Sequence, residues 1–257
     1  MKTINTRRSI RVYQNRDVDN DLLNRLLSEA THTQTMGNLQ LYSVVITRNN
    51  ENKRKLSPAH FHQPMVESAP VVLTFCADFR RTTKWAECRN AQPGYNNFLS
   101  FLNAMTDTLL FCQTFCQLAE EEGLGLCYLG TTLYSPEKII DILKLPKLVM
   151  PIATITLGWP DEAPAVSDRL PLSAIVHHET FEDYTPKRID ESYEQKENLP
   201  ENIHFCEVNH KETLAQVFTD LRYTQKDNEA MSENFLNTLK QQGFAESTSK
   251  CKIIKRI

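Results

Sequence analysis

The sequence predicts an α+β fold, and three observations lead to this prediction. The chain has 257 residues, which is enough for one large domain or two small ones. Its composition, 40% hydrophobic and 24% charged, is that of an ordinary globular protein. The predicted elements run helix, strand, strand, long helix, strand, helix, strand and then a helical arm. This order lacks the regular β-α-β alternation of a parallel sheet.

The composition excludes several functional classes. The formal charge of −3 argues against nucleic acid as the main partner, because no domain-wide basic face is implied. The chain has no apolar run of about 18 residues, so no membrane span is expected. It also begins without the apolar core of a signal peptide, and we expect a cytoplasmic protein. Seven cysteines, an odd number, favour reduced thiols over a disulfide framework.

The first half of the chain shows four clear segments. Asp19 to Ala30 has leucines at helical spacing and predicts an amphipathic helix. Leu41 to Thr47 is a β-branched strand pattern, and Val71 to Ala77 is a continuous apolar run typical of a buried strand. Asp78 to Asn97 is polar and is expected to be irregular, either an excursion over a ligand site or a long loop.

The longest helix is predicted over Phe98 to Glu122, where apolar residues cover nearly the whole circumference. A helix that is apolar all round is buried in a core or an interface, and we expect both here, with a second subunit on one side. Gly123 is expected to end this helix. A short strand and tight turn follow up to Gly130, then a helix after Ser135 and a strand over Pro151 to Gly158.

The C-terminal third is less regular. Glu182 to Glu201 is polar and charged, and it predicts an extended or loosely structured connection. Lys211 to Tyr223 and Glu229 to Gln242 predict two amphipathic helices. The remaining stretch, 245–257, is expected to be a terminal tail that is not part of the fold.

Arginines cluster near the start of the chain, in Arg7-Arg8-Ser9-Ile10-Arg11. A guanidinium presents a planar set of donors that matches phosphate oxygens two at a time. Three of them on one short segment predict a phosphate socket. The alternative is a solvated basic N-terminus, since charge runs usually lie on solvated faces.

Two further patterns bear on a ligand. The seven glycines form neither a GxGxxG fingerprint nor a GxxxxGK[ST] loop, so the usual dinucleotide and P-loop sites are excluded. The segment Thr31 to Asn38 combines hydroxyl, amide and thioether groups. It is either a plain surface loop or a ligand-binding loop.

Taken together, four segments resemble the nitroreductase family, in particular its NfsA/FRP-like group of oxygen-insensitive nitroreductases and flavin reductases. They are Arg8 to Arg11, Thr35 to Gln40, Gly123 to Gly130, and Leu157 to Pro160 followed by Arg169 to Pro171. Each motif alone is weak, but four in this order are specific. The resemblance spans roughly Arg7 to Tyr184 and favours the phosphate socket over the solvated terminus.

The resemblance implies a nitroreductase-like fold with a central, mostly antiparallel sheet, an intertwined homodimer, and FMN bound non-covalently at the dimer interface. It implies that Arg7, Arg8, Ser9 and Arg11 hold the flavin phosphate and ribityl chain, and that Arg169 returns to the phosphate. Thr35, Met36 and Asn38 would line the isoalloxazine from the partner subunit. Gln63 would bond the ribityl chain or ring edge, and Tyr128, Leu129 and Gly130 would approach the ring near N5.

The implied activity is reduction of nitroaromatics, quinones or free flavin, with NADPH or NADH as reductant, by a ping-pong two-electron mechanism. No catalytic side chain and no metal are expected, because the cofactor carries the chemistry. Residues 1–184 would form the FMN-binding domain and 185–244 a helical arm packing on the dimer. Arg222 and Lys226 are candidate contacts to the nicotinamide cofactor. Two alternatives stay open: a non-catalytic flavin-binding or redox-sensing protein, and another reductive reaction, such as dehalogenation, on the same fold.

Overall fold

The structure is a computed structural model that describes residues 4–244. The described chain forms two compact units, residues 4–165 together with 231–244, and residues 166–230. The predicted tail at 245–257 lies outside the described residues. These units reflect compactness alone, so the expected division into a flavin-binding part, 1–184, and an arm, 185–244, stays a prediction.

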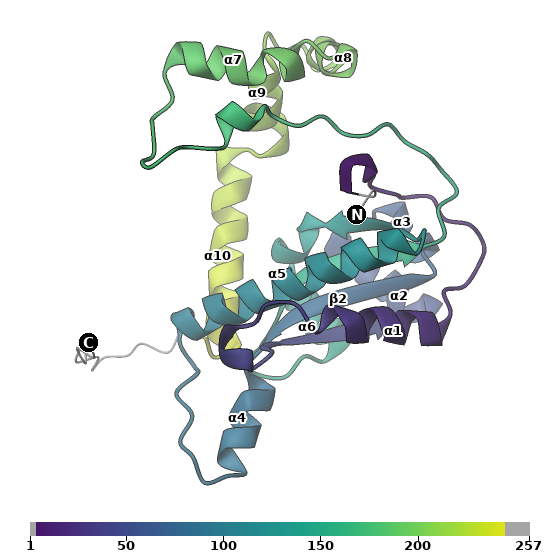
Figure 1. Cartoon of the computed structure of the whole chain (residues 1–257), viewed down its shortest axis with the longest axis vertical. Helices are drawn as coiled ribbons and strands as arrows, with labels where there is room; N and C mark the ends of the chain where they lie inside the picture. The colour runs from purple at the N-terminus through teal and green to yellow at the C-terminus, as the bar shows by residue number, and fades with distance from the viewer. Residues whose placement is uncertain (1–3, 245–257) are drawn as a thin grey trace. The chain divides into compact units, whose positions relative to one another are not determined.

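The first unit is built on a four-stranded sheet, whose strand β2 is labelled in Figure 1. The strand order is β1-β2-β4-β3, and every neighbouring pair is antiparallel. The strands are β1 (Tyr42–Thr47), β2 (Val71–Asp78), β3 (Gly125–Leu129) and β4 (Val149–Gly158). All residues of β2 and β4 are buried, because helices cover both faces of the sheet. The four predicted strands and the α+β class are confirmed.

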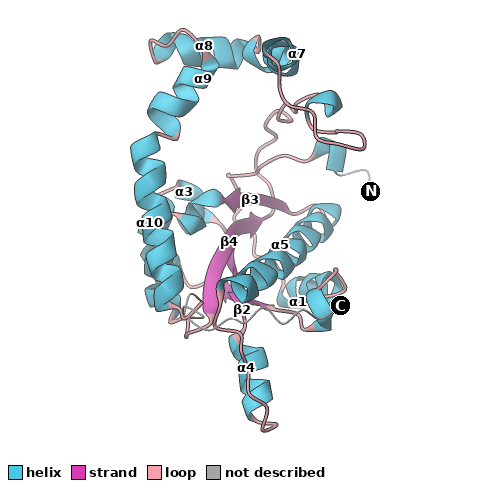
Figure 2. Ribbon diagram, turned by 90° about the vertical axis from the view of Figure 1, so that its left-hand side faces the viewer, coloured by secondary structure: helices cyan, strands magenta, loops and turns pink. Residues whose placement is uncertain are grey.

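Two helices, α1 (Asn20–Ala30) and α5 (Phe98–Glu121), pack side by side over one face of the sheet (Figure 2). Alternate residues of the central strands, such as Leu73 and Ile155, point into this layer and form the largest core cluster. Asp19 caps α1 by accepting the Asp21 N–H at 2.8 Å, as a short acidic residue before an apolar-periodic run predicts.

The opposite face is covered by three short helices, α2 (Asn50–Leu56), α3 (Pro64–Ser68) and α6 (Pro136–Leu143). Val72 and Cys127, one residue out of phase with the α5 side, point into this second cluster. A third cluster closes the sheet end where β4 begins, and the last part of α10 (Gln225–Gln241) contributes to it.

The stretch between β2 and α5 contains a helix, α4 (Arg80–Glu87), so the expectation of an irregular segment over 78–97 is wrong there. Polar residues dominate α4, and the sequence has no long apolar stripe that would predict this helix. Two local interactions hold it instead. The Asp78 carboxylate accepts the Arg81 N–H at 3.1 Å, and Lys84 pairs with Glu87 three residues on at 2.7 Å.

The second unit is helical where a loose connection over 182–201 was expected, and that expectation is wrong. Two helices occupy this part of the chain, α7 (Pro186–Glu197) and α8 (Pro200–Val208). Both begin with proline at the first helical position, and Thr185 caps α7 by accepting the Arg188 N–H at 3.3 Å. A short α9 (Leu214–Val217) continues into a π-helical turn that ends at Arg222.

Across the described chain, no helix combines the length and apolar character needed to traverse a lipid bilayer.

Candidate functional site

The arginine segment lies extended along the edge of the sheet, next to β3. Ser9 forms a parallel bridge with Leu126, and the Ile10 N–H donates to the Leu126 carbonyl at 2.9 Å. The bridge therefore places the arginines beside the β3 edge of the sheet, on both sides of Ser9 in the sequence.

Two glycines allow the segment to lie this close to the sheet. A Cβ at Gly125 would stand 2.8 Å from the Ile10 side chain, and one at Gly158 would stand 2.8 Å from the Tyr13 ring. Real Cβ atoms do not approach carbon so closely, so only glycine fits at both positions.

Hydrogen bonds then fix the segment to the loop that follows β4. The Gln14 N–H donates to the Trp159 carbonyl at 2.9 Å, and the Asp161 N–H donates to the Val12 carbonyl at 3.0 Å. The Tyr13 hydroxyl donates to the Ile10 carbonyl at 2.7 Å, and burial raises the pKa of this phenol. The backbone that carries the arginines is therefore rigidly placed.

Glu162 completes this attachment. One oxygen of its carboxylate accepts the backbone N–H groups of both Arg11 and Val12, the latter at 3.0 Å. Sequence reasoning missed Glu162, because a carboxylate that pairs with distant backbone amides leaves no local pattern.

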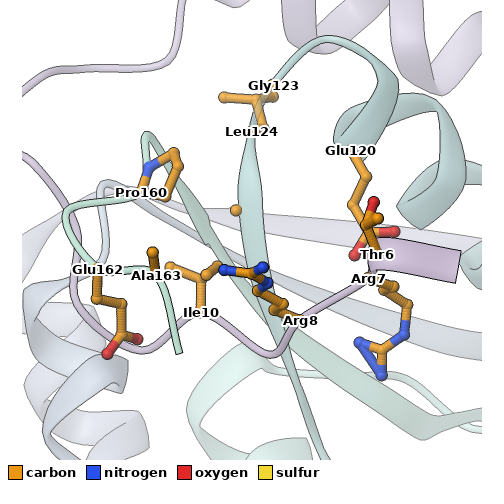
Figure 3. Close-up of a pocket in the computed structure, with 11 residues that line it drawn as sticks. Thr6, Arg7, Arg8, Ile10, Glu120, Gly123, Leu124, Pro160, Glu162 and Ala163 are labelled. Carbon is orange, nitrogen blue, oxygen red and sulfur yellow. The ribbon is translucent and has the colours of Figure 1, made fainter. Parts of the chain in front are cut away.

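Within the described part of the chain, the arginine side chains themselves lack acidic partners at salt-bridge distance. None of the ion pairs found among residues 4–244 involves Arg7, Arg8 or Arg11. Arg7 and Arg8 line a cavity of about 250 Å³ whose wall also includes Glu120 and Glu162 (Figure 3). Burial raises the pKa of Glu120, and the charge of Arg7 opposes that rise. Guanidiniums without a salt-bridge partner are available to an anion from outside the chain.

The predicted ring-binding residues lie at the far end of β3. Tyr128 is 46% exposed although it belongs to a strand, whereas Leu129 beside it is buried. Gly130 opens the 3₁₀ turn Gly130–Leu133, and beyond its chain neighbours and the backbone of its own turn no atom lies within 4 Å of where its Cβ would stand. A flat ligand can therefore reach the backbone at Gly130 without displacing a side chain.

Gln63 is brought toward this turn by its neighbours. The fully buried His60 ring bonds the Thr131 hydroxyl at 2.9 Å, and the Phe61 and Tyr134 rings stack with centroids 6.0 Å apart. Gln63 lies two residues after Phe61 and directly precedes α3. The loop that carries Gln63 is therefore packed against the turn that begins at Gly130.

The Thr35 to Asn38 loop lies elsewhere in the first unit. It precedes β1, whose first residue Tyr42 pairs with Ala77 at the end of β2. The arginine segment lies at the opposite end of the sheet, where Gly125 pairs with Gly158. One subunit therefore brings together the arginine segment, the Gly130 turn and the Gln63 loop, but leaves the Thr35 loop apart from them.

Asp107 of α5 is the second residue that sequence reasoning missed. It is 1% exposed, and its carboxylate accepts hydrogen bonds from the Thr35 hydroxyl at 2.6 Å and the Met36 N–H at 2.9 Å. A signal was present, because Asp107 is the single charged residue between Phe98 and Ala119.

The remaining candidates belong to the second unit. The exposed Arg169 donates to the Asp168 carbonyl at 2.7 Å, a local contact that leaves most of its donors available. The Arg222 guanidinium lies over the Phe205 ring, 4.2 Å from its centroid, and Lys226 is exposed at the start of α10. The expected roles of Arg169, Arg222 and Lys226 stay predictions.

The arrangement in the first unit defines a class of site. Guanidiniums that have no salt-bridge partner among the described residues lie near one end of β3. An open glycine turn backed by a partly exposed aromatic ring lies at its other end. These residues suit a ligand with an anionic group and a flat ring, and they fit FMN on both counts.

Comparisons with known proteins agree with this class. The model of the nitroreductase family matches residues 4–159, so the chain belongs to that family. It is 31% identical over 183 residues to an FMN reductase [NAD(P)H] of Bacillus subtilis, covering 70% of this chain and 74% of that protein. It is also 31% identical to an oxygen-insensitive NADPH nitroreductase of Salmonella typhimurium, covering 73% and 77%.

Among solved structures, a candidate oxidoreductase from Bacteroides fragilis NCTC 9343 is 60% identical and superposes with a TM-score of 0.95. The match covers 96% of this chain and 100% of that one. The resemblance drawn from the four sequence motifs and the nitroreductase-like α+β fold are thereby confirmed.

Proposed function

We propose that this protein is an FMN-dependent oxidoreductase that uses NAD(P)H to reduce flat electrophiles such as nitroaromatics, quinones or free flavin. The enzyme class agrees with the names of its relatives, an FMN reductase that uses NAD(P)H and an NADPH nitroreductase. The expected oxidoreductase, with FMN as cofactor and NAD(P)H as reductant, is confirmed at that level. The acceptors are our proposal.

The arginine segment carries this proposal. Arg7, Arg8 and Arg11 have no salt-bridge partner among residues 4–244, and a phosphate dianion would satisfy them. The isoalloxazine would then lie at Tyr128 and Gly130, where the backbone is open. Bound there, FMN supplies the transfer of two electrons from NAD(P)H to the acceptor. The protein contributes placement and exclusion of water, and no side-chain acid or nucleophile is required.

A homodimer would complete the site. The Thr35 loop lies at the opposite end of the sheet from the arginine segment, so it would reach a flavin only in a second subunit. Several apolar side chains of α5 support such an interface, since they are exposed by 39% or more in the single chain: Phe98, Leu99, Leu102 and Leu110. We expect this dimer to act in the cytoplasm, where NAD(P)H is available.

The test is the visible absorption spectrum of the purified protein before and after anaerobic addition of NADPH or NADH. We expect flavin bands that bleach with reductant and recover when a nitroaromatic or quinone is added. A protein that cannot be reconstituted with FMN would overturn the proposal.

A pair of arginine variants makes the test specific to the site. Arg11→Ala should lose most of the bound FMN. The matched control is Arg16→Ala, because Arg16 lies five residues on and stacks on the Trp159 ring at 3.8 Å. Equal FMN content in the two variants would contradict the assignment of the phosphate socket.

The same spectra decide between the alternatives. Bound flavin that reductant does not bleach would favour a flavin-binding or redox-sensing protein without turnover. Rapid bleaching, with no recovery on nitroaromatics, quinones or flavin, would favour another reductive reaction such as dehalogenation.

A further inference from the structure

The buried Asp107 carboxylate holds both ends of the Thr35 loop through hydrogen bonds. Besides the bonds from Thr35 and Met36, its carboxylate accepts the Leu41 N–H at 3.2 Å, so both ends of the loop meet on one side chain. Only Asp107 supplies a charge in the stretch between Phe98 and Ala119. Burying a carboxylate is costly unless hydrogen-bond donors compensate it, and here the loop provides three such donors.

The loop has a conformation that needs such an anchor. Gly37, Asn38 and Gln40 all have left-handed backbones, with φ of 56°, 55° and 53°. Glycine and asparagine tolerate this region, but glutamine adopts it at a cost. The Gln40 N–H donates to the Thr35 hydroxyl at 3.0 Å, and the Gln40 carbonyl accepts from the Arg81 guanidinium. The same hydroxyl that binds Asp107 therefore also holds the strained residue.

The other side of the loop is open. Met36 is 46% exposed, and Gly37 and Asn38 are exposed as well. A rigid loop with a buried anchor and a free outer face is suited to presenting Met36 and Asn38 to a ligand.

We propose that Asp107 is a positioning residue for the flavin: it fixes the Thr35–Leu41 loop in the conformation that presents Met36 and Asn38 to the isoalloxazine. This inference rests on the proposed function. Asp107 acts only through the loop and does not itself touch the cofactor. Loss of the carboxylate would leave the FMN phosphate socket intact while the ring loses its second wall.

The test compares Asp107→Asn with a matched control, Thr108→Val. Thr108 is the next residue of α5, is fully buried, and donates only within the helix, to the Ala104 carbonyl at 2.7 Å. Both substitutions keep side-chain volume and remove buried hydrogen bonds, so both should lower the thermal stability of the apoprotein. Only Asp107→Asn should weaken FMN binding, by about tenfold or more in Kd, and shift the absorption maxima of the bound flavin.

A second pair of variants keeps the proposal testable if Asp107→Asn does not fold. Thr35 is only partly buried, so Thr35→Val should fold, lose the bond to Asp107, and reproduce the weaker binding and shifted spectrum. Thr35→Ser retains the hydroxyl and should restore both.

The possible outcomes are distinct. Wild-type protein that does not bind FMN would mean that the proposed function has failed. Wild-type protein that binds FMN, together with Asp107→Asn and Thr35→Val proteins of unchanged affinity and flavin spectrum, would overturn the positioning role alone.

Discussion

Glu162 and Val12 lie 150 residues apart in the sequence, yet the Glu162 carboxylate accepts the Val12 N–H at 3.0 Å. The same oxygen accepts the N–H of Arg11. Successive backbone N–H groups that converge on one oxygen form an anion-binding concavity, and the chain fills this one itself. Glu162 thereby fixes the backbone of the residue whose guanidinium is proposed to bind phosphate.

We therefore expect Glu162→Ala to weaken FMN binding by about tenfold, a change of about 1.4 kcal/mol. The arginine segment would lose its clamp and would have to be ordered when FMN binds. Equilibrium titration of the apoprotein with FMN measures this effect.

Glu162→Gln is the control for charge, because it removes the carboxylate but keeps an oxygen that can accept both N–H groups. It should bind FMN at least as tightly as the wild type, since a negative charge near the phosphate is gone. Tighter binding by Glu162→Ala than by the wild type would show that repulsion of the phosphate outweighs the clamp.

Two glycines five residues apart should respond differently to alanine. At Gly125 a Cβ would meet the Ile10 side chain at 2.8 Å, whereas at Gly130 it would enter open space. Gly125→Ala should therefore destabilise the apoprotein by about 1–3 kcal/mol, as overpacking typically does. Gly130→Ala should leave the apoprotein as stable as the wild type but weaken FMN binding, because its methyl group would occupy the ring side. Chemical denaturation and FMN titration of both variants check this contrast.

The strands and the arginine segment could be predicted from sequence because their causes are local. Val71 to Ala77 is apolar at every position except Thr74, as burial on both faces requires, and the spacing of Arg7, Arg8 and Arg11 directly indicates anion chemistry. Asp107 and Glu162 could not be assigned in the same way. Asp107 is marked in the sequence as the single charge between Phe98 and Ala119, but its role, like that of Glu162, depends on donors that folding brings to it and that no local pattern predicts.

The helices α4 and α7 show a second kind of feature that could not be predicted from the sequence. Both are polar, with few apolar positions to mark a buried face. Each is held by a side chain that accepts an N–H of the first turn, Asp78 for α4 and Thr185 for α7, and by an ion pair between neighbouring turns. A polar stretch of this kind has the composition of a loop, so hydrophobic periodicity alone does not reveal the helix.

Because the His60 ring is buried, we expect the free energy of unfolding to decrease in mild acid. Burial lowers the pKa of His60 from its ordinary value of 6.5 to about 4. As the pH falls below 6.5, the unfolded chain therefore binds a proton at this residue before the native protein does, and stability decreases until the pH reaches about 4. Across this window the contribution lost is about 2–3 kcal/mol, at 1.36 kcal/mol per pKa unit.

Urea unfolding of the apoprotein at pH 7 and pH 4.5 measures the loss, and His60→Gln should reduce it by about that amount. The control is His62→Gln, because His62 is exposed two residues away and should leave the difference between the two pH values unchanged. An equal loss in His60→Gln and wild-type protein would contradict a buried, neutral ring at this position.

Arg11 and Met36 lie at opposite ends of the sheet, and this separation predicts how many intact FMN sites a dimer of two differently substituted subunits retains. If each flavin is held by the arginine segment of one subunit and the Thr35 loop of the other, Arg11→Glu and Met36→Glu affect different halves of a site. A heterodimer with one substitution in each subunit then has both faults in the same site and retains one intact site. We expect it to bind one FMN per dimer with wild-type affinity and to show about half the NAD(P)H-dependent activity.

Both substitutions placed in one subunit instead put one fault in each site, so binding should weaken at both. Differently tagged subunits, co-expressed and purified by both tags, give the two arrangements from the same pair of substitutions. The reverse pattern would mean that the loop and the arginine segment of one subunit serve the same flavin.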